Sequence, residues 1–167
     1  MNNNRNYELQ CLLELLSAVL DDEGIPVWQK FPDWSKLYKM ADYHHVANVI
    51  YGPIISMDRR RMAKWQDSFE ERFHYAVIMQ ERYQGMKQEF FSVMEKEGLH
   101  CMELEETVLN GCYKKREQRY PLPLTFLVEE GKSEAIKTAL ERGGFEENPI
   151  KGKKPLEGEH WFRKPGG

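Results

Sequence analysis

The spacing of the apolar residues changes near Gly98, and this change constrains the fold more than any other feature of the chain. Before Gly98, apolar residues recur every three or four positions, which is typical of amphipathic helices. After Gly98, short apolar runs alternate with short amphipathic segments, which predicts strands alternating with helices. We therefore expect an α+β protein with a helical region in residues 1–97 and a small α/β core in residues 98–167.

Two helices are predicted in the first part of the helical region. The apolar residues of segment 9–20 share one helical face. Asp33 or Ser35 can cap a second helix, because a short oxygen-bearing side chain accepts hydrogen bonds from the first free backbone amides. Its apolar stripe extends over residues 34–49, and Gly52-Pro53 is expected to interrupt it.

A third, long helix is predicted over about residues 58–97, with an aromatic stripe along its length. Such a helix would be about 60 Å long, whereas a compact chain of this size has a radius of gyration of about 15 Å. Either the helix bends, most easily at Gly85, or its aromatic stripe binds a protein partner or a second copy of the chain.

The second region is predicted to form a small mixed sheet with flanking helices. Apolar runs bounded by Gly or Pro predict strands at residues 99–104, at 123–129, from 145 onward and at 161–162. Helices are expected at residues 106–115 and 133–142, the second closed by Gly143-Gly144.

Composition excludes several classes of function. The chain has 24 basic and 27 acidic residues, so a net charge of −3 gives no general attraction for nucleic acid or anionic lipid. No apolar run reaches the length of about 20 residues that a membrane span needs, and no secretory signal is visible at the amino terminus. We expect a cytoplasmic protein without a membrane or nucleic-acid partner, whose Cys11, Cys101 and Cys112 are reduced thiols.

Several short segments occur in an order that is typical of one family. They are Trp34, Ala41-Asp42-Tyr43-His44-His45, Gly98-Leu99, Arg119 with Tyr120-Pro121, Phe126-Leu127-Val128, and Gly144-Phe145. In order and spacing the chain resembles the uncharacterised nucleotidyltransferase family of bacteria, a branch of the DNA polymerase beta superfamily. The resemblance implies a nucleotidyltransferase-like core, and because family members are generally longer, residues 98–167 are expected to be an incomplete one.

The chain departs from this family at the positions that matter for catalysis. Family members hold a divalent metal with two aspartates, two residues apart on one strand, and the resemblance places Pro123 and Thr125 at those positions. The family's Leu-Lys-Gly turn reads Leu104-Glu105-Glu106 here. We therefore predict no catalytic residue and no metal ligand, only a vestigial cleft lined by Glu103, Glu105, Glu106, Lys115, Arg119, Pro123, Thr125 and Glu129.

Three functional interpretations follow. In the first, the chain is a catalytically inactive nucleotidyltransferase-like protein that binds a nucleotide or a protein partner and needs no cofactor. In the second, it is an active enzyme whose Mg²⁺ site is rebuilt from carboxylates, with Glu103 and Glu105 on one strand end and Glu129-Glu130 after a neighbouring strand. In the third, the resemblance misleads and the chain is an unrelated helical and α/β interaction module.

Two further clusters have more than one interpretation. Lys114-Lys115-Arg116, with Arg119, can face the vestigial nucleotide cleft or can form the last turn of the predicted helix, where cations are favoured. His44 and His45 are adjacent, so on a helix they diverge by about 100° and cannot bind one metal together. A packed or capping role is the favoured interpretation for the two histidines.

Overall fold

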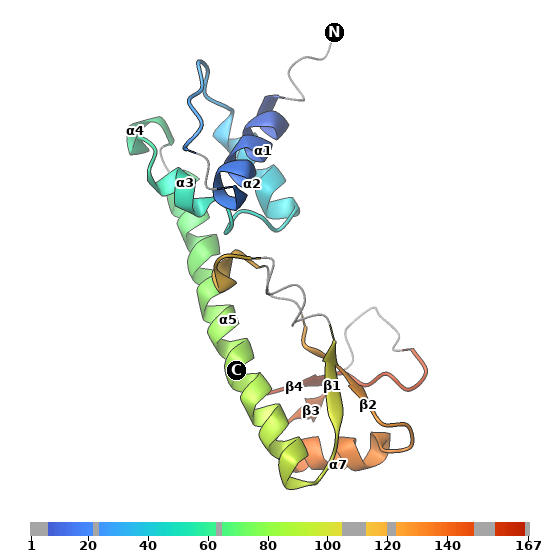
Figure 1. The fold of residues 1–167 in the computed structure, drawn as a ribbon. Helices are drawn as coiled ribbons and strands as arrows, with labels where there is room; N and C mark the ends of the chain where they lie inside the picture. The colour runs from blue at the N-terminus through green and yellow to red at the C-terminus, as the bar shows by residue number, and fades with distance from the viewer. Residues whose placement is uncertain are drawn as a thin grey trace. The chain divides into compact units, whose positions relative to one another are not determined.

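The chain folds into two compact units that mix helices and strands (Figure 1). The computed structural model describes residues 7–21, 24–62, 65–104, 113–119, 123–148 and 156–165. The first unit contains the described residues up to 80 together with 113–119, and the second contains 81–104 and the described residues from 123 onward. The division falls inside a helix and not at Gly98, because the end of that helix packs against the strands.

Helices build the first unit. They are α1 (Tyr7–Leu20), α2 (Trp34–Tyr43), α3 (Tyr51–Ile55), α4 (Arg59–Met62) and the first half of α5 (Trp65–Lys96). α1 packs against both α2 and α3 (Figure 1). The most deeply buried side chains of this core include Leu15, Leu37, Ile50, Ile54 and Phe69. The helix predicted at residues 9–20 is confirmed by α1.

The second predicted helix begins as expected but ends early. The Asp33 carboxylate accepts hydrogen bonds from the backbone amides of Ser35 and Lys36, so Asp33 is the cap. α2 then stops at Tyr43, and the stripe predicted to reach residue 49 continues as a turn. Ala47 and Ile50 are buried within that turn. These buried turn residues are apolar, so the sequence continues the apolar pattern of a helix where no helix exists. The expectation that Gly52-Pro53 interrupts a helix is wrong, because both residues lie in the first turn of α3, where a proline N–H is not needed.

The long helix α5 is continuous through Gly85. Apolar residues of its stripe are buried in the cores of both units. Phe69 is buried in the first unit, and Phe90 and Met94 are buried in the second. α5 ends at a glycine cap, in which Gly98 has a φ of 63° and the Leu99 amide donates to the Met94 carbonyl. In the part of the chain that the structure describes, no helix is both long and apolar enough to cross a bilayer.

The second unit contains two antiparallel strand pairs and helix α7 (Ser133–Arg142). Strand β1 (Cys101–Leu104) pairs with β2 (Thr125–Val128), and β3 (Glu146–Glu147) pairs with β4 (Phe162–Arg163). Phe90 of α5 stacks on Phe126 of β2, with ring centroids 4.0 Å apart. Ile136 and Leu140 of α7 complete this core.

Most of the strands and helices predicted after Gly98 are confirmed, but their assembly differs. Among the described residues the strands form two separate two-stranded sheets, whereas one mixed sheet was predicted. Of the helix predicted at 106–115, residues 106–112 lie outside the described part, and residues 113–115 are not helical. They lead into a single 3₁₀ turn, η1 (Arg116–Gln118).

Candidate functional site

The residues predicted to line a vestigial cleft are divided between the two units. Lys115 and Arg119 belong to the first unit. The second unit contains Glu103, Pro123, Thr125 and Glu129. Glu105 and Glu106 lie outside the described residues.

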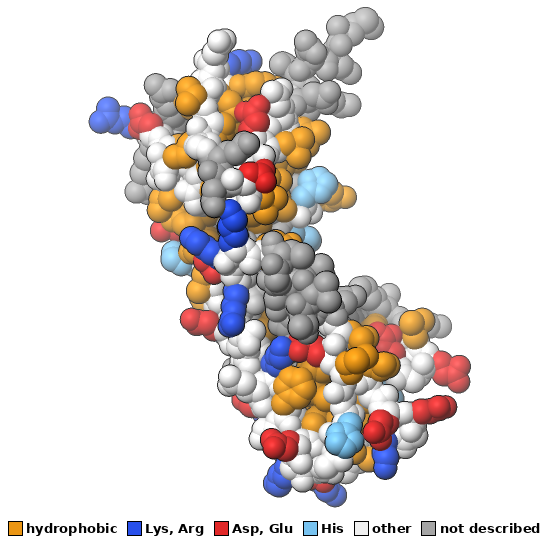
Figure 2. Space-filling view, viewed as in Figure 1, with side chains coloured by type: hydrophobic (Ala, Val, Ile, Leu, Met, Phe, Trp, Pro, Cys, Tyr) orange, Lys and Arg blue, Asp and Glu red, His pale blue; other side chains and the backbone are white. Residues whose placement is uncertain are grey.

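Pro123 and Thr125, which the resemblance places at the metal-binding positions, share the solvent face of β2 with Leu127. Residues 123, 125 and 127 are exposed, whereas 124, 126 and 128 are partly buried, as the two-residue period of a strand requires. Met102 of β1 pairs directly with Leu127, and both side chains are more than half exposed. Figure 2 shows hydrophobic side chains on the surface over these two strands.

Glu103 lies on the opposite face of the same strand pair. Its cross-strand partner is Phe126, which packs into the core of the second unit. The Glu103 side chain is 11% exposed, and its Oε2 atom lies 2.7 Å from Nζ of Lys87 on α5. Its other oxygen, Oε1, is buried and has no hydrogen-bond partner among the described residues. The charge of Glu103 is therefore balanced by a lysine on the core side of the strands.

Glu129 does not lie beside Glu103 on the strand pair. It follows β2 at an exposed position, three residues beyond Phe126, which corresponds to about 10 Å along the strand. Within the described ranges, no three His, Cys, Asp or Glu side chains are grouped closely enough to hold a metal ion.

Lys115 and Arg119 lie on either side of η1, which side-chain amides hold against the helices of the first unit. Nδ2 of Asn48 donates to the Glu117 carbonyl at 2.7 Å and to the Gln118 carbonyl at 3.3 Å. Nε2 of Gln80 donates to the Arg119 carbonyl at 3.3 Å. Asn48 is only 5% exposed, so its amide is a buried anchor for segment 113–119.

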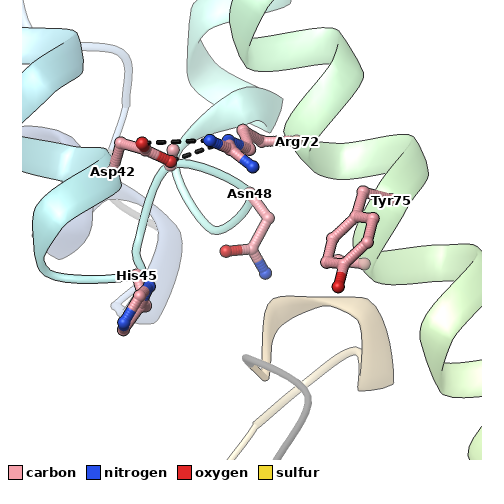
Figure 3. Close-up of a pocket in the computed structure, with 7 residues that line it drawn as sticks. Asp42, His45, Asn48, Arg72 and Tyr75 are labelled. Carbon is pink, nitrogen blue, oxygen red and sulfur yellow. Dashed lines mark hydrogen bonds and ion pairs between the residues drawn. The ribbon is translucent and has the colours of Figure 1, made fainter.

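A pocket of about 140 Å³ adjoins this anchor, and the sequence did not predict it. It is lined by Asp42, His45, Ala47, Asn48, Arg72, Tyr75 and Ala76, which come from the end of α2, the following turn and α5 (Figure 3). Asp42 belongs to the segment that suggested the family, but nothing in the sequence indicates that this segment meets α5.

The Arg72 guanidinium and the Asp42 carboxylate form a bidentate ion pair in this pocket (Figure 3). Nε of Arg72 lies 2.7 Å from Oδ1 of Asp42, and Nη2 donates to Oδ2 at 3.0 Å. The neighbouring Tyr38 hydroxyl and then Asp42 raise the pKa of Arg72 above its ordinary value. Arg72 is thus a fixed cation whose position is set by two parallel hydrogen bonds.

His45 follows the C-cap of α2, His44, and has an unusual backbone conformation with a φ of 57°. The His45 amide donates to the Asp42 carbonyl, and the Val46 amide donates to the Ala41 carbonyl at 2.8 Å, which together form a Schellman motif. For the two histidines a packed or capping role was predicted, and both lie at the end of α2, with His44 as its C-cap. α5 and α7 end in the same motif, but they place Gly98 and Gly144 at the left-handed position. At this position, which adjoins the pocket, α2 is followed by a histidine, whereas α5 and α7 are followed by a glycine.

The described cysteines are free, as predicted. Cys11 is buried in the first unit, and Cys101 is partly buried in β1. Burial raises the pKa of both thiols, so neither is activated as a nucleophile. Cys112 lies outside the described residues.

No family model matches the chain, and no curated protein or solved structure matches it. The resemblance to bacterial nucleotidyltransferases therefore stays a prediction from the residues.

Proposed function

We propose that the chain is a nucleotidyltransferase-like protein without catalytic activity, which works by binding a nucleotide or a protein partner. The observation that carries the proposal is the arrangement of β1 and β2. The positions that the resemblance assigns to the metal-binding aspartates hold Pro123 and Thr125 on the exposed face. The nearby carboxylate of Glu103 lies on the other face and is paired with Lys87.

The same arrangement weakens the proposal of a rebuilt metal site. A divalent cation prefers several oxygen ligands that converge on one point. Glu103 and Glu129 are about 10 Å apart along the strands, and a cation at Glu103 would have to displace the Lys87 ammonium. An inactive binding protein needs neither rearrangement.

Thermal melting with nucleotides tests the proposal. The melting temperature of the full chain would be measured with ATP, GTP, CTP and UTP, each with EDTA, Mg²⁺ or Mn²⁺. We expect at least one nucleotide to raise the melting temperature equally in EDTA and in metal, and we expect the Glu103→Gln variant to respond in the same way. A rise that requires metal and disappears in Glu103→Gln would indicate a rebuilt metal site. No rise with any nucleotide would contradict nucleotide binding.

A further inference from the structure

We propose that helix α1 joins two copies of the chain into a dimer, by packing antiparallel against α1 of the second copy. This inference goes beyond the proposed function, because it uses none of the strand positions that the resemblance identifies. It depends on three properties of α1: a row of exposed leucines, the spacing of these leucines and the residues that flank them.

The leucines of α1 lie on two sides of the helix. Leu12 and Leu15 are 3% and 0% exposed, and they belong to the core of the first unit. Leu9, Leu13 and Leu20 are 39%, 57% and 49% exposed. Figure 2 shows hydrophobic side chains at the surface of this unit. An ordinary surface helix is apolar only on the side of its core, so the outer leucines indicate a second apolar contact.

The outer leucines form a row with the spacing of a seam between two helices. This leucine row consists of Leu9, Leu13, Leu16 and Leu20, which are separated by four, three and four residues. Leu16 is partly buried and lies on the same face as the other three. Apolar residues that alternate in this way bring two helices together along a common seam. The row is about 16 Å long.

The same spacing makes the leucine row complementary to its own copy. In either direction along the helix, the separations are four, three and four residues. When two copies of α1 pack antiparallel about a twofold axis, Leu9 therefore lies opposite Leu20 of the second copy, and Leu13 lies opposite its Leu16. An interface between identical surfaces requires such a match. The antiparallel orientation also places the positive end of each helix dipole beside the negative end of the other.

The residues beside the leucine row favour a second copy over an anionic lipid surface. Gln10 and Ser17 flank the row on the side away from the core, and neither carries a charge that would repel its copy. Of the carboxylates of α1, Glu8 is buried, and Glu14 accepts hydrogen bonds from the side chains of Gln10 and Trp28. A helix that lies on a membrane surface normally has Lys or Arg on its polar face, and α1 has neither.

The shortness of the leucine row predicts a weak dimer. A stable interface buries about 800 Å² on each partner. Two helices in contact along about 16 Å bury less than that, so we expect monomer and dimer to interconvert with concentration.

Sedimentation velocity of the full chain over a concentration series tests the proposal. The variants are Leu13→Glu and Leu13→Gln. The matched control is Leu127→Glu, because Leu127 is a leucine of similar exposure, 54%, in the second unit. Leu13 is more than half exposed, so neither variant removes a core contact, and circular dichroism at the lowest concentration checks that each variant is folded.

We expect the unaltered chain to change from monomer to dimer between about 1 µM and about 500 µM. Leu13→Glu should weaken dimerisation at least about tenfold and Leu13→Gln by a smaller factor, whereas Leu127→Glu should leave it unchanged. The proposal is overturned if the unaltered chain stays monomeric over the whole series. It is also overturned if the folded Leu13 variants dimerise as the unaltered chain does, or if Leu127→Glu weakens dimerisation equally.

A mixing experiment tests the antiparallel orientation. Leu9→Glu and Leu20→Lys should each weaken dimerisation, because each places a charge opposite a leucine. An equimolar mixture of the two variants should recover it, since the introduced carboxylate and ammonium face each other only in an antiparallel pair. A mixture that dimerises no better than either variant alone would overturn the proposal.

Discussion

Nζ of Lys87 lies 2.7 Å from Oε2 of Glu103, on the core side of the β1–β2 pair. This ion pair joins α5 to β1, the strand that pairs with β2. The two side chains are 24% and 11% exposed, so neither charge is fully hydrated. The pair balances a carboxylate that otherwise would be the nearest candidate ligand for a cation.

The first prediction concerns this ion pair. Lys87→Met leaves Glu103 partly buried without its cation, and we expect the free energy of unfolding to fall by roughly 2 kcal/mol. Urea denaturation at pH 7 measures the change. The double variant Lys87→Met with Glu103→Met should recover most of the loss, because it removes both charges. If the single and double variants are equally destabilised, the pair does not stabilise the unit.

The second prediction concerns the backbone of His45. A left-handed conformation costs an L-residue about 1–2 kcal/mol, and glycine avoids this cost but is more flexible when unfolded. We therefore expect His45→Gly to stabilise the chain by about 0.5–1 kcal/mol in urea denaturation. Gly98→Ala is the reverse control, since Gly98 has the same role at the end of α5 and a φ of 63°. It should destabilise the chain by about 1 kcal/mol, and a stabilising effect there would contradict the argument.

The third prediction concerns the anchor of segment 113–119. Asn48→Ala removes two donors to the carbonyls of Glu117 and Gln118, so we expect a loss of about 1–3 kcal/mol. Hydrogen exchange of the Gln118 and Arg119 amides should accelerate at the same time. Gln80→Ala is the control and should have a smaller effect, because it removes one longer bond. Unchanged exchange in Asn48→Ala would show that the segment is held by other contacts.

The fourth prediction concerns acid stability. His160 and then Lys137 hold the pKa of the Glu147 carboxyl below its ordinary value. A carboxyl with a lowered folded-state pKa stabilises the fold above its unfolded pKa of about 4.3, and this contribution disappears as the pH falls through the folded value. Glu147→Gln should therefore have a lower melting temperature than the unaltered chain between pH 7 and about pH 5, and this difference should narrow below about pH 4.3.

The control for this prediction is Glu130→Gln, at an exposed position after β2. It should show no such difference. A difference in melting temperature that widens as the pH falls below about 4.3 would have the wrong sign and would contradict the lowered pKa of Glu147.

The local elements of this fold could be predicted from periodicity and caps. α1, β1, β2 and α7 follow directly from apolar spacing and from Gly at the ends, whereas the sequence left Asp33 and Ser35 as alternative caps of α2. The end of α2 could not be predicted in this way, because Ala47 and Ile50 are buried in a turn and imitate a helical face. The pairing of strands into two separate sheets depends on contacts between distant segments, which periodicity does not contain.

In the candidate site, too, local features could be predicted from the sequence and contacts between distant segments could not. Helical spacing argued against joint metal binding by His44 and His45, but it did not predict that the helix ends at these residues. The pocket itself was not predictable, because it joins residues 42–48 to residues 72–76 of another helix. The cation at that junction, Arg72, has no motif around it, and only the packing of α5 brings it to Asp42.

We propose that this chain does not transfer nucleotides. The most direct test is an assay of nucleotide transfer from labelled ATP, GTP, CTP and UTP, with Mg²⁺ or Mn²⁺, to the chain itself and to added protein and RNA acceptors. We predict no labelled product above that of a heat-denatured control. Metal-dependent transfer that is lost in the double variant Glu103→Gln with Glu105→Gln would contradict this proposal and would establish an enzyme with a rebuilt carboxylate site.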